Sequence, residues 1–598
     1  MKYRIKTSNI APEPILNRDY AYASFAEGRA FPEKKTGRLP AMGWNSWNAF
    51  GSGNTEALTR EMAARIKALE LDKLGYQYLV LDDGCYLPER VDGRVRNEPN
   101  KFPSGFRKLS DDLHAMGLKF GMYNDVGTNL CAGAHVGTCG FEDVDAESYA
   151  EWGIDFLKVD NCYYSWDNAT FSNPENARYT YAPNIRGIRV AGKNFDKAFA
   201  ANEGELVGRG AVRHGNGYVT NIGIFDGTNV GNTPVGEQAG GLLYTVTVPE
   251  SGEYALTVEY ATGREVGVGE WLQVEVDGEG YVFDGFLPVT ESTETFVTSP
   301  EITLVLTAGE HRILLCNHRR QENTLNSYAA MFYALQEKSK EREVVLSLCE
   351  WGKTMPHKWA YKMGDSWRIL NDITFHVARD GNTGHADWER PGTDSITSQY
   401  DKAVIMDEYA GLDRGWNDPD MMVIGMDGIK EEMARSHMAM WCMMNSPLML
   451  GLDLRRVEKG DALYEIIANR DLIALNQDAL GIQAKRIFCT LEADAPDTAY
   501  ITNHDRVDIL AKPLSDGSVA LLFQNLRQEE MSGDFAVTAA EIAEKLGGKL
   551  PDAEGFANAA SYRVQDLWTR EVVTQDGRFA VERLPGCGHV IVRVTPVK

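Results

Sequence analysis

Lys158 and Asp160 stand one residue apart near the end of an apolar run, in the segment Leu157-Lys158-Val159-Asp160-Asn161-Cys162. Residues two positions apart on a β-strand point to the same side, so both side chains should emerge together at the carboxyl end of this strand. A lysine beside an aspartate lowers the pKa of the carboxyl group and keeps it ionised, as a nucleophile requires. The pair is therefore either part of a catalytic site or an ion pair that caps a buried strand.

The pair belongs to a series of short, apolar, strand-like runs that alternate with amphipathic helical segments. This pattern predicts an α/β fold, a (β/α)₈ TIM barrel, which carries its catalytic groups at the carboxyl ends of its strands. The eight strands are expected near residues 42–47, 78–83, 119–125, 157–160, 344–351, 366–372, 416–424 and 446–452.

Two further stretches depart from this alternation. One is rich in Gly, Val, Thr and Tyr and has period-two strands between turns, which predicts a β-sandwich inserted after strand 4, on the catalytic face. The other, near the C-terminus, has alternating strands and predicts an antiparallel β-sandwich. The expected organisation is a leader (1–40), a first barrel part (41–176), the insertion (177–320), a second barrel part (321–483) and a C-terminal β-domain (484–598).

Composition restricts the partners of the protein. The 598 residues carry a formal net charge of -25, which argues against nucleic acid or an anionic membrane as a partner. The chain has no long apolar run, and its first residues lack the apolar core of a signal peptide, so we expect a cytoplasmic protein. Nine cysteines in a chain of this length do not form a disulfide framework, and their odd number suits reduced thiols.

If the barrel is correct, its strand ends bring carboxylates and aromatic rings into one pocket. Such a lining is typical of a sugar site, because carboxylates accept hydrogen bonds from hydroxyls and an indole stacks on the C–H face of a sugar. The side chains expected there are Trp44, Asp82, Asp83, Tyr123, Lys158, Asp160, Glu350, Arg368 and Asp372.

Glycoside hydrolysis with retention needs two carboxyl groups about 5–5.5 Å apart, one as nucleophile and one as general acid and base. Asp160 beside Lys158 fits the ionised nucleophile. Asp372, four residues after Arg368, fits the acid if an apolar wall or neighbouring charges keep it protonated. From spacing alone, the two roles could be reversed.

A series of motifs resembles one enzyme family. In order, the motifs are Gly43-Trp44-Asn45-Ser46-Trp47, Leu81-Asp82-Asp83, Gly121-Met122-Tyr123, Cys131-Ala132-Gly133, Lys158-Val159-Asp160-Asn161-Cys162, Cys349-Glu350-Trp351, Gly415-Trp416-Asn417-Asp418-Pro419-Asp420-Met421, Ser446-Pro447-Leu448-Met449 and Ala474-Leu475-Asn476-Gln477-Asp478. Across about 41–165 and 326–490 the chain resembles glycoside hydrolase family 27, the α-galactosidases and α-N-acetylgalactosaminidases. One departure is Asp82-Asp83-Gly84-Cys85-Tyr86, where the family usually has Asp-Asp-Cys-Trp. The pocket wall after strand 2 is therefore expected to differ.

The resemblance implies a retaining double displacement without a cofactor, with Asp160 as nucleophile and Asp372 as acid and base. It implies that Asp82, Asp83 and Lys158 hold the 4- and 6-hydroxyls of the sugar. It also assigns an apolar wall to Trp44, contacts near the 2- and 3-hydroxyls to Arg368, and places in the pocket to Tyr123, Cys131, Glu350 and Trp351.

Cysteines matching Cys131 and Cys162 form a disulfide in secreted family members. A reducing cytoplasm would instead keep the pair as thiols, and the sequence leaves both states of Cys131 and Cys162 open.

Glu350 carries the expectation about the substrate. The resemblance implies that a glutamate here accepts a hydrogen bond from the 2-hydroxyl of galactose, whereas N-acetylgalactosaminidases have a small residue that makes room for the acetamido group. The expected substrate is a galactose-containing oligosaccharide. The alternatives are an α-N-acetylgalactosaminidase, a β-L-arabinopyranosidase, which the retained Asp83 disfavours, and a catalytically inactive sugar-binding protein.

The insertion resembles carbohydrate-binding modules of the family 6 and 35 type, through Asn202-Glu203-Gly204-Glu205-Leu206 and the segment 252–261. In those modules an early Glu-x-Glu pair helps to hold a structural calcium ion, so Glu203 and Glu205 are candidate calcium ligands. The alternative is a β-sandwich that only walls the active site or packs against another subunit of a homo-oligomer.

Overall fold

The structure is a computed structural model of the chain. It describes residues 37–127, 129–161, 182–207, 211–222, 240–263, 270–317, 319–340, 342–352, 356–373, 388–389, 395–491 and 499–597. Cys162, part of the expected cysteine pair, lies outside the described residues.

Eight parallel strands form a barrel, which confirms the predicted fold. They are β1 (Met42–Asn45), β2 (Tyr78–Val80), β3 (Lys119–Asp125), β4 (Phe156–Asp160), β17 (Val345–Cys349), β18 (Ser366–Arg368), β19 (Trp416–Asp418) and β20 (Leu448–Leu450). Neighbours in the sheet follow one another along the chain, and β1 also pairs with β20. A parallel bridge between Met422, just after β19, and Leu450 completes the ring.

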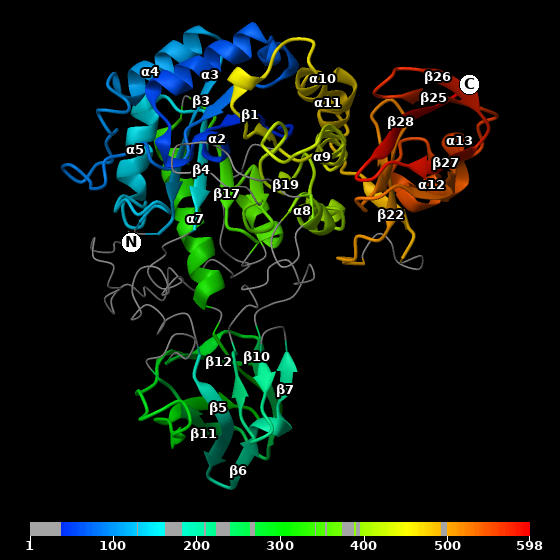
Figure 1. Ribbon diagram of the computed structural model, residues 1–598. Coiled ribbons are helices and arrows are strands. Elements are labelled where there is room, and N and C mark those ends of the chain that lie inside the picture. The colour runs from blue at the N-terminus through cyan, green and yellow to red at the C-terminus, as the bar shows by residue number, and fades with distance from the viewer. Residues whose placement is uncertain are drawn as a thin grey trace.

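Helices surround these strands (Figure 1). They are α2 (Trp47–Phe50), α3 (Glu56–Ala68), α4 (Gly105–Ala115), α5 (Glu142–Trp152), α7 (Arg319–Lys338), α8 (Ile396–Ala403), α9 (Glu431–Met443), α10 (Ala462–Ile467) and α11 (Arg470–Asn476). The helix α3 shows how the sequence specifies them. Its N-cap residue Thr55 accepts a hydrogen bond from the Leu58 amide, and Met62 and Ile66, four residues apart, are both buried against the sheet side.

The barrel has separate inner and outer hydrophobic clusters. Inside, one cluster comprises Val80, Phe156, Val345, Met421 and Met449. A larger cluster fills the space between strands and helices. Residues of one strand therefore divide between two environments according to the side to which they point.

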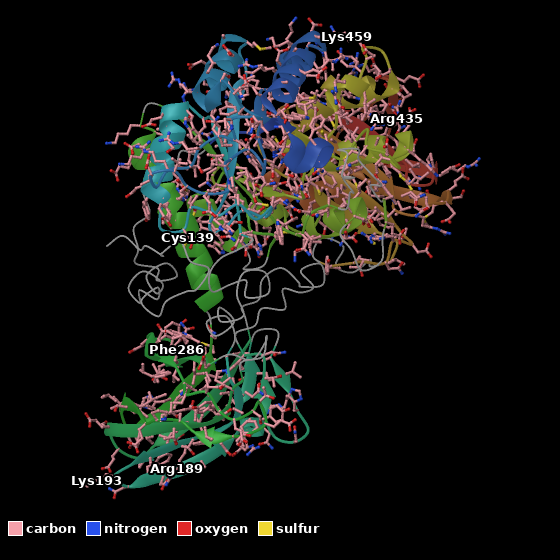
Figure 2. All side chains as sticks on the ribbon, turned by 60° about the vertical axis from the view of Figure 1, so that its left-hand side comes forward. Cys139, Arg189, Lys193, Phe286, Arg435 and Lys459 are labelled. Atoms are coloured by element: carbon pink, nitrogen blue, oxygen red, sulfur yellow. The ribbon has the colours of Figure 1, made fainter. Side chains whose placement is uncertain are left out.

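The insertion consists of antiparallel sheets. One has the order β13-β12-β16-β10-β7, and the other is built on β14-β11-β5-β9-β8, with β15 on β11 and β6 on β5. The strands are β5 (Asn184–Gly192), β6 (Phe195–Ala200), β7 (Glu205–Val207), β8 (Val212–Arg213), β9 (Val219–Thr220), β10 (Gly241–Val248), β11 (Gly252–Ala261), β12 (Trp271–Val276), β13 (Tyr281–Phe286), β14 (Val297–Thr298), β15 (Ile302–Leu306) and β16 (Gly309–Cys316). The two sheets share a core of their own. Figure 2 shows Phe286 on the side of the insertion toward the barrel, with Arg189 and Lys193 on the opposite side.

The C-terminal region is a second antiparallel β-structure, as expected. Its six-stranded sheet has the order β21-β22-β23-β28-β25-β26, and β24 pairs with β27. The elements are β21 (Lys485–Cys489), β22 (Val507–Pro513), β23 (Val519–Asn525), β24 (Met531–Thr538), α12 (Ala539–Leu546), α13 (Ala553–Ala557), β25 (Tyr562–Asp566), β26 (Val572–Gln575), β27 (Arg578–Leu584) and β28 (His589–Pro596).

Buried charges join this region to the barrel. Arg506 contacts Asp401 of α8 at 2.5 Å, and Tyr400 of α8 donates a hydrogen bond to Asp508 at 3.0 Å. Among the helices of the described ranges, none combines the length and apolar character needed to cross a membrane.

Candidate active site

The turn after β1 positions one pocket carboxylate. Asn45, the last residue of β1, donates its side-chain amide to Asp82 Oδ2 at 2.8 Å, and the hydroxyl of Ser46 accepts the Asp82 backbone N–H at 3.0 Å. Asn45 Oδ1 accepts the Trp47 backbone N–H at 2.8 Å. The sequence Asn45-Ser46-Trp47 thus fixes Asp82 and turns the chain so that Trp47 reaches the pocket.

The pocket lies at the carboxyl ends of the barrel strands. Among the described residues it is lined by Trp47, Asn48, Asp82, Asp83, Tyr123, Cys131, Lys158, Asp160, Asp372, Asp420 and Met421. A pocket with five carboxylates, one ammonium and one indole suits a single sugar unit with several hydroxyls.

Seven of the predicted residues line this pocket: Asp82, Asp83, Tyr123, Cys131, Lys158, Asp160 and Asp372. Trp44 does not, and its expected role as the apolar wall was wrong. Its ring is fully buried in the cluster between strands and helices, and its indole N–H donates to the Leu452 carbonyl at 2.9 Å. Trp47, which packs against the inner cluster, provides the aromatic wall instead.

Three other predicted residues, Glu350, Trp351 and Arg368, are not among the described lining residues. Glu350 is fully buried directly after β17, and Trp351 follows it with a left-handed backbone, φ 62°. Arg368, at the end of β18, is 2% exposed and contacts two lining carboxylates. Its Nη2 lies 3.1 Å from Asp372 Oδ1 and 2.8 Å from Asp420 Oδ2.

Lys158 pairs with Asp82 rather than with Asp160. Its Nζ lies 2.8 Å from Asp82 Oδ2 and 5.5 Å from the centroid of the Tyr123 ring. Burial disfavours the Lys158 ammonium, but the surrounding carboxylates, Asp82 first, outweigh this effect and raise the pKa of Lys158. The lysine therefore stays charged at the base of the pocket.

Lys158 does act to lower the pKa of Asp160, as expected, but the net shift is upward. Burial raises the pKa of Asp160, and the Asp372 carboxylate adds to the rise, so that the opposing effect of Lys158 is outweighed. Two donors hold the carboxylate in place: the Asn161 backbone N–H at 2.9 Å and the Tyr123 hydroxyl at 3.1 Å. These hydrogen bonds favour the ionised form that a nucleophile needs.

Asp83 is held by two backbone amides. Its Oδ2 accepts the Ala132 N–H and its Oδ1 accepts the Gly84 N–H, both at 2.6 Å. Burial, together with the negative charges of Asp82 and Asp160, nevertheless raises the pKa of Asp83 to about 6. A ligand hydroxyl that donates to this carboxylate would replace part of the lost hydration.

Asp372 has different surroundings from those expected for a general acid. Its side chain is 47% exposed, and Arg368 is its ion-pair partner, so an apolar wall does not enclose it. The neighbouring carboxylates are Asp160 and Asp420, each of which has its pKa raised in part by Asp372.

Cys131 is disulfide-bonded, which answers a question that the sequence left open. Its sulfur lies 3.2 Å from the Tyr123 hydroxyl and 3.5 Å from Asp160 Oδ2. The bond therefore fixes a loop residue directly against the candidate nucleophile.

Sequence reasoning missed four lining residues: Trp47, Asn48, Asp420 and Met421. Asp420 and Met421 belong to a motif that carries the family resemblance, but the sequence alone assigns neither of them a role in the pocket. Trp47 lies in a turn, where strand periodicity gives no direction. Asn48 is fully buried, and neither polar atom of its amide has a hydrogen-bond partner in the described part of the chain.

The expected calcium ligands of the insertion are exposed. The Glu203 carboxylate accepts the Ala200 backbone N–H at 2.6 Å, and Glu205 begins β7. A calcium site there remains a prediction.

The fold and the pocket together define a glycoside hydrolase built on a TIM barrel. The family model described as "Alpha galactosidase A" matches residues 39–189 and 310–478, and the model "Alpha galactosidase C-terminal beta sandwich domain" matches residues 504–594. The protein therefore belongs to the α-galactosidase family, glycoside hydrolase family 27.

Individual relatives agree with this assignment. An α-galactosidase from Oryza sativa subsp. japonica is 26% identical over 94% of this chain and 85% of the relative. α-Galactosidase A from Cellvibrio japonicus is 26% identical over 94% and 92%. The structure of a Saccharomyces cerevisiae α-galactosidase with raffinose has the same fold, with a TM-score of 0.56, 20% identity and coverage of 94% and 98%.

Proposed function

We propose that this protein is an exo-acting α-galactosidase that removes terminal α-D-galactosyl residues with retention. The observation that carries the proposal is the carboxylate-rich pocket at the carboxyl end of the barrel, in which Asp160 and Asp372 both lie. Its family membership supports the same reaction.

In the first step, Asp160 attacks the anomeric carbon and forms a covalent galactosyl-enzyme, while Asp372 donates its proton to the leaving glycosidic oxygen. In the second step, Asp372 takes a proton from a water molecule. The resulting hydroxide attacks the anomeric carbon and displaces Asp160, so that galactose leaves with its original configuration. Two inversions at one carbon give net retention.

The remaining pocket residues are proposed to select galactose. Asp82, Asp83 and Lys158 present two carboxylates and an ammonium to the 4- and 6-hydroxyls, and Trp47 offers an apolar face to the ring. Glu350 is fully buried after β17. We propose that its carboxylate accepts a hydrogen bond from the 2-hydroxyl of galactose and leaves no room for an acetamido group. Arg368 is proposed to act near the 2- and 3-hydroxyls.

The test compares nitrophenyl glycosides of α-galactose, α-N-acetylgalactosamine and β-L-arabinopyranose. We expect nitrophenol release from the α-galactoside to be fastest, and Asp160→Asn to abolish it. Release from one of the other two sugars, with none from the α-galactoside, would assign a different specificity. No release from any of them would favour an inactive sugar-binding protein.

The natural substrate is proposed to be a soluble galactose-containing oligosaccharide of the raffinose type. A relative of the same fold is known with raffinose, and the insertion follows strand 4 of the barrel, where we propose that it narrows access to the pocket. Comparing release of galactose from raffinose with release from a galactomannan polymer tests this proposal. Faster release from the polymer would contradict it.

We also propose that the inserted β-sandwich binds carbohydrate. Its sheet built on β5 and β11 carries half-buried His214, Tyr218 and Phe296, with ring centroids 4.6 and 5.4 Å apart along the row. Arg186 covers Phe296 and pairs with Glu259 at 3.1 Å, so polar groups flank the rings, as is common in sugar sites. Titration of Asp160→Asn with galactose, with and without Tyr218→Ala, should reveal a second site that Tyr218→Ala removes.

Location and calcium are proposals of a different kind. A cytoplasmic location is tested by cell fractionation, and the disulfide at Cys131, a bond typical of oxidising compartments, weighs against it.

A structural calcium near Glu203 and Glu205 predicts that chelation lowers the unfolding temperature of the insertion and that Glu205→Gln removes this effect. A homo-oligomer is tested by light scattering.

A further inference from the structure

Arg368 is shared between two carboxylates in very different environments. Its Nη2 lies 2.8 Å from Asp420 Oδ2 and 3.1 Å from Asp372 Oδ1. The Arg368 and Asp420 side chains are almost fully buried, at 2% and 3% exposure, whereas that of Asp372 is 47% exposed. Ion pairs are stronger in a buried environment than beside solvent, so Arg368 interacts more strongly with Asp420 than with Asp372.

The backbone around Asp420 shows that its carboxylate is held at this place. Asp420 is a non-glycine residue with φ 82°, a left-handed conformation that costs conformational energy. Hydrogen bonds hold it on several sides: its N–H donates to Asp418 Oδ1 at 2.9 Å, and its carbonyl accepts the Trp441 indole N–H at 2.9 Å. The Met421 N–H donates to Asp420 Oδ1 at 2.7 Å.

A second contact links Asp420 to the strand-end loop that carries Asp372. The backbone N–H of Ile373, the residue after Asp372, donates to Asp420 Oδ2 at 2.8 Å. The same oxygen therefore accepts from Arg368 and from the neighbour of Asp372. Asp420 can influence both the charge beside Asp372 and the position of its main chain.

We propose that Asp420 is a positioning residue for the acid and base of the reaction: it neutralises Arg368 and anchors Ile373, so that Asp372 can hold a proton beside a guanidinium group. The inference rests on the proposed function, in which Asp372 protonates the leaving oxygen. If Asp420 lost its charge, the positive charge of Arg368 would be less neutralised and would stabilise the Asp372 carboxylate more strongly, and a carboxylate cannot donate a proton.

Several charged groups lie near Asp420 and Arg368 and influence the pKa values of these two residues. Asp420 faces Arg368, Asp372, Asp418 and Lys158, and burial, opposed by Arg368, raises the pKa of Asp420 to about 6. Around Arg368 the charged or titratable groups are Asp420, Asp372, Asp418 and Cys349. Asp372 also acts on Asp160 across the pocket. Above about pH 6, Asp420 is therefore ionised and can neutralise Arg368.

The test is the Asp420→Asn variant, which keeps the shape of the side chain and removes its charge. The pH profile of kcat/KM is measured with two galactosides, one with a dinitrophenol leaving group that needs little protonation and one with a sugar leaving group that needs it. We expect the alkaline limb for the sugar-leaving substrate to move down by about one pH unit. We expect turnover of that substrate to fall at least about tenfold more than turnover of the dinitrophenyl galactoside.

Two comparisons separate this role from a structural one. Asp427→Asn removes an exposed carboxylate that follows β19 and pairs with Arg456 at 2.7 Å, and it should leave both measurements unchanged. Asp420→Gly removes the carboxylate while suiting the left-handed backbone, so it keeps the test available if Asp420→Asn does not fold. Equal losses on both leaving groups with an unmoved alkaline limb would overturn the inference. Wild-type turnover of the α-galactosides reports separately on the proposed function.

Discussion

Replacing Asp83 by asparagine should change how the stability of the barrel depends on pH. Asp83 is 2% exposed, and burial first, then neighbouring negative charges, raise the pKa of its carboxyl group from 3.8 to about 6. At 1.36 kcal/mol per pKa unit, the difference corresponds to about 3 kcal/mol. This is the free energy that the folded protein loses when Asp83 ionises in its buried position.

The sign follows from proton binding. The folded state holds the Asp83 proton more tightly than the unfolded chain, so this residue favours folding at low pH, and the effect is lost as pH rises from about 4 to above 6. In Asp83→Asn the side chain stays neutral at every pH. Near pH 4 a protonated carboxyl and an amide are similar in shape and charge, so both proteins should have similar stability.

Between pH 4 and pH 7 the variant should therefore gain roughly 2 kcal/mol relative to wild type, because the unfolded carboxyl group is already more than half ionised at pH 4. For a domain of this size the gain corresponds to a rise of about 4 °C in the unfolding temperature. Differential scanning calorimetry at both pH values, at matched ionic strength, measures the transition of the barrel.

Asp111→Asn, on the exposed face of α4, is the control and should show no such pH dependence. Galactosidase activity of Asp83→Asn should fall strongly although stability rises, because a neutral amide replaces a carboxylate that is proposed to hold hydroxyls. If the unfolding temperatures of Asp83→Asn and wild type differ by the same amount at pH 4 and pH 7, burial of the charge does not dominate at this position.

Three further predictions concern aromatic and cationic residues. Trp47→Ala should raise KM with little change in the unfolding temperature, because Trp47 lines the pocket. Trp44→Phe should leave KM unchanged but lower the unfolding temperature by several degrees, because it leaves a cavity and an unpaired Leu452 carbonyl. Steady-state kinetics and thermal unfolding measure the two effects. Lys158→Met should lower stability by about 3–5 kcal/mol, because Asp82 would stay buried without its partner, and a denaturation experiment that finds no loss would contradict this. Burial lowers the pKa of Lys512 to about 7, so the unfolded chain binds this proton more tightly than the folded protein. The stability of the wild type should therefore be lowest below pH 7 and should rise progressively toward pH 10. A Lys512→Met variant should lack this slope in thermal unfolding.

The strand pattern was sufficient to predict the barrel and most of the pocket. Asp82, Tyr123 and Lys158 lie at strand ends, where a period of two decides which side chains point inward, and the structure places all three in the pocket. The same periodicity could not distinguish Trp44 from Trp47. One is a strand residue that points toward the helices, and the other reaches the pocket through a turn set by the Asn45 side chain.

Two features depended on the balance of forces in three dimensions. The sequence placed a lysine near Asp160 but did not show that Lys158 pairs with Asp82, nor that burial outweighs its charge. The contact of Asp420 with Arg368 depends on a left-handed backbone and on hydrogen bonds from Ile373 and Trp441, far away along the chain. Neither arrangement leaves a periodic signal in the sequence.

Asp160 is proposed to form a covalent bond to galactose, and this bond can be detected by trapping the intermediate. The enzyme is incubated with an activated galactosyl fluoride whose 2-position carries fluorine, digested, and its peptides are analysed by mass spectrometry. We expect one sugar adduct, on the peptide that contains Asp160, and none in Asp160→Asn. An adduct on the peptide with Asp372, or turnover that inverts the anomeric centre without any adduct, would contradict it.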